Sequence, residues 1–236
     1  MTIDDTRFAV VDVETTGMDP QVNKIVQIAA YEVYRGEITL LYESLVHPLR
    51  SIPPETSAVH HITDKMVEFA LPWEAVWRQM GAVLASMDVL VAHNAVFDRG
   101  FLPETGKPWL CTKRLAQHLW PEAPNHKNQT LRYWLGLELA AAAHDATGDT
   151  LVTAHVLLKE IEAYLARGGA DDPMALVRLA DAPVRIEKMP FGKHFGTTLS
   201  DVPSDYLRWT LKNIQDMDPD LRWSIEQVVQ QGVGAR

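Results

Sequence analysis

A strand-like run near the start of the chain carries two acidic residues among apolar ones. Residues 10–17 read VVDVETTG, and Asp12 and Glu14 follow FAVV, which has the composition of a buried strand. Alternate residues of a strand share a face, so the two carboxylates project together, about 7 Å apart along the backbone. Burying them costs several kcal/mol unless a cation lies between them. The pair predicts a metal-binding strand end.

The pair alone is weak evidence, because its alternative is two solvated acids on a surface strand. In a chain with 17 Asp and 14 Glu, an Asp-x-Glu arises about once by chance. Two further segments supply context. Asp98 lies in VAHNAVFD, on the first turn of a short helix that follows a second apolar strand, and Asp149 lies in HDATGDT at the start of a long helix. Each could be a simple helix cap, but together they predict acids that converge at one edge of a sheet.

The apolar pattern predicts a mixed sheet covered by helices. Residues 8–17 and 24–49 read as three strands in a meander, with a glycine turn at residues 35–37, and residues 88–94 read as a further buried strand. Residues 51–63 read as a loop. Helices are expected at residues 64–87 with a break near Pro72, and at residues 95–102, 110–120, 128–139 and 144–168. Strands that alternate with helices in this way are typical of an α/β fold.

A linker at residues 169–183 is expected to separate a domain at residues 1–168 from a small α+β module at residues 184–236. The module reads as a glycine-turned β-hairpin and two short helices, the second starting at Asp218 with Pro219 in its first turn. The net charge of −9 lies wholly before residue 184, with 15 Lys and Arg against 24 Asp and Glu, because the module holds seven of each. This balance argues against a wide basic face for nucleic acid.

Three motifs resemble those of a known enzyme family. The segments VVDVETTG, VAHNAVFD and HDATGD, with VHHIT at residues 59–63, are similar in order and spacing to the motifs of the DEDDh 3′-to-5′ exonucleases, the DnaQ-like family. The resemblance covers residues 8–165 and implies a ribonuclease H-like fold. Met18 and His61 depart from residues common in the family. The segment from Met189 onward is similar to the C-terminal module of one exodeoxyribonuclease.

The resemblance implies two Mg²⁺ or Mn²⁺ ions held by Asp12, Glu14, Asp98 and Asp149. The resemblance implies that Asp12 is a ligand of both ions. Glu14 and Asp149 would complete the ion that carries the attacking water, and Asp98 would be a ligand of the other ion. His144, five residues before Asp149, would accept the proton of that water as general base. Hard oxygen ligands without thiolates suit magnesium better than zinc, and two such ions can activate water and stabilise a leaving oxygen.

The motif positions also imply a site for the terminal nucleotide at the 3′ end. Single-stranded DNA ends should be favoured, because the nucleotide must enter a narrow site without a partner strand. RNA, and the oligomeric state, stay open. The residues expected to contact the substrate are Thr15, Thr16 and Gly17 through backbone amides, Met18 against the base, and His61 and Asn94 near phosphates.

The expected role is repair or trimming of DNA ends in the cytoplasm, by a soluble protein with no membrane partner. No run of about 18 apolar residues exists, and a lone Cys111 favours a reducing compartment. The alternatives are a polymerase proofreading subunit, an RNA exonuclease of the ribonuclease T type, and a catalytically silent nucleic-acid adaptor.

Several other residues are expected to be structural. His93 should pack at a strand end, and Trp209 and Trp223 should pack the small core of the module. The turn FGKHFG is ambiguous. It could cradle a phosphate with Gly192, Lys193, His194 and Gly196, but a glycine-bounded hairpin is usually only a hairpin.

Overall fold

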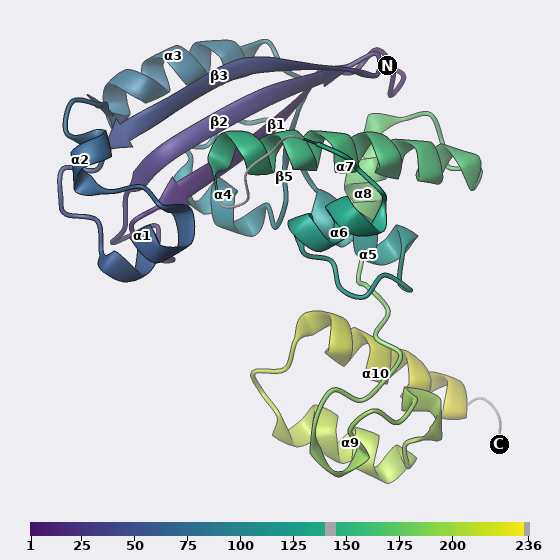
Figure 1. The fold of residues 1–236 in the computed structure, drawn as a ribbon. Helices are drawn as coiled ribbons and strands as arrows, with labels where there is room; N and C mark the ends of the chain where they lie inside the picture. Colours follow the sequence, from purple (N-terminus) through teal and green to yellow (C-terminus); the bar gives the residue numbers. More distant parts are fainter. Residues whose placement is uncertain (140–144, 234–236) are drawn as a thin grey trace. The chain divides into compact units, whose positions relative to one another are not determined.

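The fold comprises two compact units, Met1–Asp181 and Ala182–Arg236 (Figure 1). The structure is a computed structural model that describes residues 1–139 and 145–233. Each unit has its own hydrophobic core, and each is described by itself below.

The first unit is built on a mixed six-stranded sheet in the order β4-β3-β2-β1-β5-β6. The first three strands form the predicted antiparallel meander, and β5 and β6 add in parallel beside β1. The short β4 pairs with β3 in parallel. The strands are β1 (Phe8–Thr15), β2 (Ile25–Tyr34), β3 (Glu37–His47), β4 (Leu71–Pro72), β5 (Val89–Ala92) and β6 (Trp109–Cys111).

Eight helices of the described residues pack around this sheet. They are α1 (Pro54–His60), α2 (Asp64–Val67), α3 (Trp73–Ala85), α4 (Val96–Phe101), α5 (Thr112–Leu119), α6 (Asn128–Trp134), α7 (Ala146–Ala166) and α8 (Pro173–Asp181). The predicted break near Pro72 separates α2 from α3. The expected loop at residues 51–63 is wrong in part, because it contains α1, which starts with Pro54 in its first turn.

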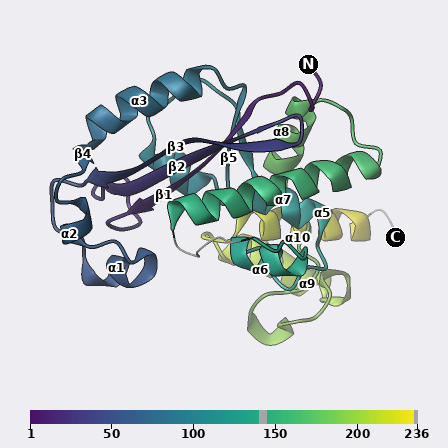
Figure 2. The same cartoon turned by 45° about the horizontal axis from the view of Figure 1, so that its top comes forward.

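The alternation of β1 assigns its side chains to two separate cores. Phe8 and Val10 belong to the cluster that α7, α5 and α8 build on one face of the sheet. Ala9, Val11 and Val13 belong to the cluster that α3 and α4 build on the other face. Figure 2 shows α3 and α7 on opposite sides of the sheet. Because alternate residues share a face, Asp12 and Glu14 continue the row of Phe8 and Val10 on the α7 side.

Residues 173–181 were expected to belong to a linker, and this expectation is wrong. They form α8, whose Leu176, Val177 and Ala180 are buried in the core on the α7 side. The carbonyl of Ala180 accepts a hydrogen bond of 2.9 Å from Arg114 Nε. The spacing of the three apolar residues is helical, but the run is too short to stand out against its polar surroundings. The first unit therefore extends to Asp181.

The second unit packs two helices, α9 (Ser204–Asn213) and α10 (Pro219–Val233), against an irregular segment. As predicted, Asp218 starts the second helix, and its Oδ1 accepts from the backbone N–H groups of Asp220 and Leu221 at 2.9 and 3.0 Å. The expected β-hairpin is reduced to one bridge between Lys188 and Thr198. The buried core consists of Met189, Leu199, Val202, Leu207, Met217, Leu221 and Ile225.

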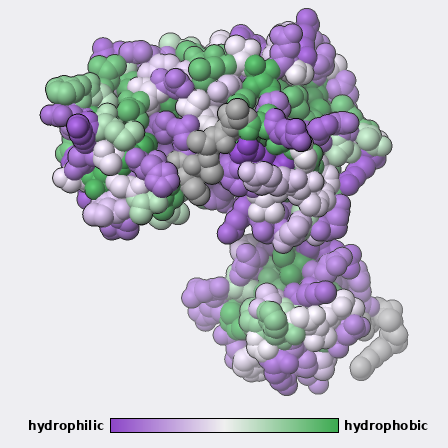
Figure 3. Space-filling view, in the orientation of Figure 1, coloured by the Kyte–Doolittle hydropathy of each residue, from purple (hydrophilic) through white to green (hydrophobic). Residues whose placement is uncertain are grey.

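No helix of the described residues is long and apolar enough to cross a membrane. The face seen in Figure 3 mixes hydrophilic and hydrophobic side chains over both units. Exposed apolar residues of this kind are ordinary on a folded surface.

One carboxylate of α7 is buried far along the helix from the acidic motifs. Glu160 is 0% exposed, and neither of its carboxylate oxygens has a hydrogen-bond partner among the described residues. Burial raises the pKa of Glu160 well above its usual range, and the Cys111 thiol nearby acts in the same direction. The folded chain therefore holds Glu160 protonated where the unfolded chain ionises it. This group costs stability as the pH rises above about 4.3.

Glu160→Gln should remove this pH dependence, because glutamine resembles the neutral acid. We expect the free energy of unfolding of the variant, relative to the native chain, to rise by about 1.4 kcal/mol per pH unit from about pH 5 up to the folded pKa. Urea denaturation at several pH values measures the difference. Glu162→Gln, at an exposed position two residues later, is the control, and a difference independent of pH would contradict the expectation.

Candidate active site

The end of β1 presents Asp12 and Glu14 to the face of the sheet that α7 covers. Burial raises the pKa of Asp12 well above its usual range, and the charges of Asp98 and Glu14 add to the rise. Burial also raises the pKa of Glu14 to about 7, with further contributions from Asp149 and Asp145. These carboxylates are held close enough to repel one another. Acids from three segments of the chain therefore lie near one another at this edge of the sheet, as predicted.

Asp98 reaches the same place from the other side of the sheet. It lies in the first turn of α4, directly after β5, and is 2% exposed. Its Oδ1 accepts a hydrogen bond of 3.1 Å from the backbone N–H of Val13, between the two acids of β1. Burial raises its pKa to about 8, and the bond from Val13 offsets only part of that rise. The helix turn thus ties Asp98 to the strand that carries Asp12 and Glu14.

The start of α7 supplies the third acidic segment. Asp145 is the N-cap of the helix, and its Oδ2 accepts from the N–H of Gly148 at 3.0 Å. Asp149 lies in the first turn, and its Oδ1 accepts a hydrogen bond of 2.6 Å from Gln129 Nε2 on α6. The hydrogen bond from Gln129 fixes the Asp149 carboxylate, and the helix dipole favours an anion there.

Gln27 connects β2 to the start of α7. It lies opposite Glu14 in the β1–β2 register. Its Nε2 donates to Asp145 Oδ1 at 2.7 Å, and its Oε1 accepts from the N–H of Ala146 at 3.1 Å. The side-chain amide of Gln27 therefore holds the carboxylate of the N-cap residue Asp145. It also accepts a hydrogen bond from a first-turn N–H that has no partner within the helix. This bridge sets where the first turn of α7, and with it Asp149, lies above the strands.

The donor set fits a divalent cation that keeps part of its water. Asp12, Glu14 and Asp98 offer hard oxygen ligands, and their pKa values are raised because burial and neighbouring acids oppose their ionisation. Among residues 1–139 and 145–233, no group of three or more His, Cys, Asp or Glu side chains is arranged so that it could hold a metal ion by itself. Mg²⁺ needs none, because it commonly takes one or two carboxylates together with water and substrate phosphate.

His144, the expected general base, lies outside the described residues. It directly precedes Asp145, the cap of α7. Its role stays a prediction.

The predicted substrate loop after β1 uses its hydroxyl groups internally. Thr15 Oγ1 donates to the carbonyl of Gly17 at 2.7 Å, and Thr16 Oγ1 accepts from the N–H of Lys24 at 3.0 Å. A Cβ on Gly17 would lie 2.6 Å from Asn23 Oδ1, so only glycine fits this turn. The side chain of Met18 is 77% exposed and free to contact a ligand.

Asn94 and His61 are both exposed and both adopt left-handed backbone conformations, with φ of 71° and 61°. Asn94 lies between β5 and α4, four residues before Asp98. His61 caps the C-terminal end of α1, where its N–H donates to the carbonyl of Ser57 at 2.8 Å. These positions leave their side chains accessible, and their contact with substrate stays a prediction.

The sequence analysis missed Gln27, Gln129 and Asp145. The sequence does contain an indication for Gln27, because it is a polar residue inside the apolar run IVQIAA, on the strand that pairs with the acidic strand. Asp145 also had one, as an aspartate just before a long helix. Gln129 had none, because its partner lies 20 residues away in the sequence.

His93 is structural, as predicted. Its Nδ1 lies 2.9 Å from Thr112 Oγ1 and its Nε2 lies 2.9 Å from the carbonyl of His126. Burial lowers its pKa to about 4, which keeps the ring neutral.

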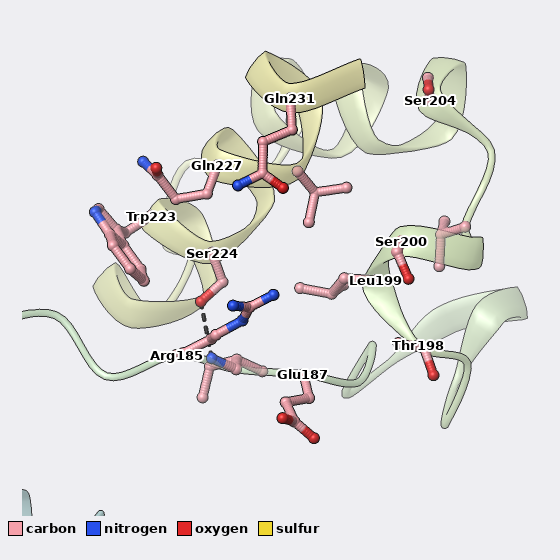
Figure 4. Close-up of a pocket in the computed structure, with 13 residues that line it drawn as sticks. Arg185, Glu187, Thr198, Leu199, Ser200, Ser204, Trp223, Ser224, Gln227 and Gln231 are labelled. Atoms are coloured by element: carbon pink, nitrogen blue, oxygen red, sulfur yellow. Dashed lines mark hydrogen bonds between the residues drawn. The ribbon is translucent and has the colours of Figure 1, made fainter. Parts of the chain in front are cut away.

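The second unit holds a cavity of about 480 Å³ between α10 and residues 185–187 and 198–204. Figure 4 shows Arg185 and Leu199 facing each other across it, and Ser224 Oγ accepting from the backbone N–H of Ile186 at 2.8 Å. The lining contains none of the predicted site residues. The acidic site of the first unit is therefore the candidate for the chemistry.

Comparison with protein families identifies the first unit. A family model described as "Exonuclease", RNase T, matches residues 9–157. A second model, described as "Putative quorum-sensing-regulated virulence factor", matches residues 176–213.

Two curated proteins show the extent of the similarity. Exodeoxyribonuclease 10 of Escherichia coli K12 is 33% identical over 230 residues, which cover 94% of this chain and 98% of that protein. A DNA polymerase III subunit epsilon-like protein of Rhodobacter capsulatus is 38% identical over 178 residues, which cover 70% of this chain but 25% of that protein.

Solved structures confirm the predicted ribonuclease H-like α/β fold. Exonuclease X in complex with 5′ overhanging duplex DNA matches with a TM-score of 0.62 and 32% identity, over 73% of this chain and 99% of that one. The nuclease domain of 3′hExo, a DEDDh family member bound to rAMP, matches with a TM-score of 0.58 over 69% of this chain and 94% of that one. At 13% identity the second match shows the fold alone.

Asp12→Asn should stabilise the protein in the absence of divalent cations. Burial and the neighbouring carboxylates make ionisation of Asp12 costly in the folded chain, so at a pH above the ordinary pKa range of carboxyl groups we expect the substitution to raise the melting temperature in EDTA by about 2–4 °C for each kcal/mol of that cost relieved. Added Mg²⁺ should then stabilise the native chain more than the variant. Differential scanning calorimetry checks both, with the exposed Asp4→Asn as control. A lower melting temperature in EDTA would refute that cost.

Gln27→Ala should weaken the site without removing any of its acids. Losing both hydrogen bonds frees the first turn of α7 and with it Asp149, so we expect a loss of about 10- to 100-fold in metal affinity, as for other outer-shell partners of metal ligands. Titration of Mn²⁺ by isothermal calorimetry measures this. Gln79→Ala, at an exposed position on α3, should leave the affinity unchanged, and equal affinities for all three proteins would refute the role of Gln27.

Proposed function

The chain belongs to the exonuclease family, a family of hydrolases, and on that premise we propose that it removes nucleoside 5′-monophosphates from the 3′ ends of DNA. The observation that carries the proposal is the crowding of Asp12, Glu14 and Asp98 with the start of α7, which raises three carboxylate pKa values at one sheet edge. Exodeoxyribonuclease 10, which matches over nearly its whole length, supports DNA as the substrate.

In this proposal, Asp12, Glu14, Asp98 and Asp149 hold two Mg²⁺ or Mn²⁺ ions. When bound, such ions supply an activated water and stabilise charge on the phosphate and the leaving oxygen. The chain does the positioning. The N–H of Val13 orients Asp98, and Gln129 orients Asp149.

His144 accepts the proton of the attacking water. Histidine is suited to this step because its imidazole can be neutral, and so accept a proton, near physiological pH. Its place one residue before the cap of α7 supports the assignment, because the same helix start carries Asp149.

The terminal nucleotide binds at the turn that follows β1. The turn of Thr15, Thr16 and Gly17 meets the nucleotide, with the N–H of Thr16 held by the carbonyl of Lys24 at 2.8 Å, and the exposed Met18 packs against its base. His61 and Asn94 approach the phosphates. Single-stranded ends are favoured, because the terminal base must leave its partner to enter the site. Exonuclease X, a relative in structure, was solved with duplex DNA that has a 5′ overhang.

The biological role is repair or trimming of DNA ends in the cytoplasm, by an enzyme that acts without a polymerase. The polymerase-related protein of Rhodobacter capsulatus shares only 25% of its length with this chain, whereas the exodeoxyribonuclease shares 98%. The proofreading alternative therefore has less support, and a polymerase that copurifies with the protein would favour it.

A degradation assay tests the function. We expect 5′-labelled single-stranded DNA to shorten stepwise from its 3′ end in Mg²⁺, and to stay intact in EDTA. Asp98→Asn and His144→Ala should each lose at least about 100-fold in turnover, and His144→Ala should keep its affinity for DNA. The exposed Asp181→Asn is the matched control. RNA of the same sequence tests whether the enzyme prefers DNA to RNA. Internal cuts, or activity in EDTA, would contradict the proposal.

A further inference from the structure

The second unit carries an exposed patch of aromatic and basic side chains, which we call the aromatic patch. It consists of Lys193, His194 and Phe195 in a turn and Tyr206 and Trp209 on α9. Phe195 is 74% exposed and Trp209 is 53% exposed. The expectation that Trp209 packs the small core is wrong, because the core of this unit does not include it.

Four side chains of the patch contact one another, and Phe195 follows His194 at the end of the turn. Tyr206 and Trp209 stack with centroids 5.9 Å apart and planes at 26°, and His194 meets Tyr206 edge-on at 4.6 Å. Lys193 Nζ lies 4.9 Å from the centroid of the Tyr206 ring, within the range of a cation–π interaction. Tyr206 is therefore the centre that joins the turn to α9.

The turn is fixed in place before any ligand binds. Gly192 has φ of +70°, and a Cβ there would lie 2.6 Å from Tyr206 Oη, so the backbone approaches the ring as closely as only glycine allows. The N–H of Gly196 donates to the carbonyl of Met189 at 2.8 Å, and the N–H of Thr197 donates to that of His194 at 3.0 Å. A preformed surface of this kind loses little conformational freedom on binding.

The local charge favours an anionic partner. Residues 188–200 contain two lysines and His194 but no carboxylate, and the acids Glu187 and Asp201 lie at the two ends of this segment. On α9, Lys212 follows Trp209 by three residues, which makes the two neighbours on the helix surface. The acid of α9, Asp205, lies 3.7 Å from Arg208 as an ion pair. The acidic excess of the whole chain lies in the other unit, because residues 182–236 hold seven basic and seven acidic residues.

We propose that the aromatic patch binds a single strand of nucleic acid, with unpaired bases stacked on Phe195 and Trp209 and a backbone phosphate at Lys193. Stacked bases lie about 3.4 Å apart, so the 5.9 Å between Tyr206 and Trp209 leaves no room for a base between them. The bases must therefore use the outer ring faces. An apolar protein segment would instead have to bury the exposed Lys193 without a charge partner.

This site deepens the proposed function and rests on it for the nature of the polymer. A strand held at the patch is tethered to the chain that trims its 3′ end, so rebinding after each cut becomes intramolecular. Because every base can stack on an aromatic ring, binding at the patch should not depend on the nucleotide sequence.

The test measures binding by the full chain in EDTA, so that no hydrolysis occurs. The probe is a fluorescein-labelled oligothymidylate of about 20 nucleotides, followed by fluorescence anisotropy. We expect Phe195→Ala and Trp209→Ala each to raise Kd by about tenfold, and Trp209→Phe to restore most of the affinity. Leu165→Ala, which shortens an exposed side chain on α7, is the control. Thermal melts monitored by circular dichroism check that the variants are folded.

Salt dependence separates a phosphate contact from a structural effect. Lys193→Gln should lower the slope of log K against log salt concentration by about 0.7, the share of one phosphate on a single strand. Lys159→Gln, on α7, should not. If the patch variants have the same Kd values and salt slopes as the native chain, the proposal is wrong. That result is the one expected if the patch binds a protein instead of nucleic acid.

The two proposals fail in distinguishable ways. If the native chain shortens DNA in Mg²⁺ while the patch variants bind normally, the patch proposal alone is wrong. If the variants lose binding but the native chain hydrolyses nothing, the proposed function alone is wrong.

Discussion

Burial of ionisable acids at the end of β1 is the constraint on which the first unit depends. Asp12, Glu14 and Asp98 all have raised pKa values because burial and neighbouring charges oppose their ionisation. Such a site opposes folding, and the apolar clusters on the two faces of the sheet must offset it. At this strand end, the side chains proposed for catalysis therefore lower the stability of the fold. In the proposed function, divalent cations bound by these acids would offset that cost.

The sequence was most informative where local pattern and burial agree. Alternation along β1 predicted that Asp12 and Glu14 share a face, and the apolar strand before Asp98 predicted its place at a helix start. Gln27 and Gln129 escaped prediction because their roles arise from contacts between distant elements, β2 with α7 and α6 with α7. A single sequence shows periodicity within an element but not which polar groups meet between elements.

Short elements escaped prediction for a different reason. β6 is three residues long, and α8 follows a stretch with several acids and buries only Pro173, Leu176, Val177 and Ala180. Both are stabilised by packing against neighbours and not by their own propensity, which tertiary context can override. In the second unit, the small core accepts few side chains, and Trp209 is left on its surface. A sequence pattern that places tryptophan on a helix cannot distinguish these two outcomes.

The chain order of the acidic segments has a consequence during synthesis. The three strands of the meander and the helix that carries Asp98 all leave the ribosome before α7, which starts at Ala146 and closes the other face of the sheet. Because N-terminal segments emerge first, a growing chain cannot gather its acids until that late helix docks. Until that helix docks, the unfinished polypeptide lacks the part of the acidic site that Asp145 and Asp149 supply.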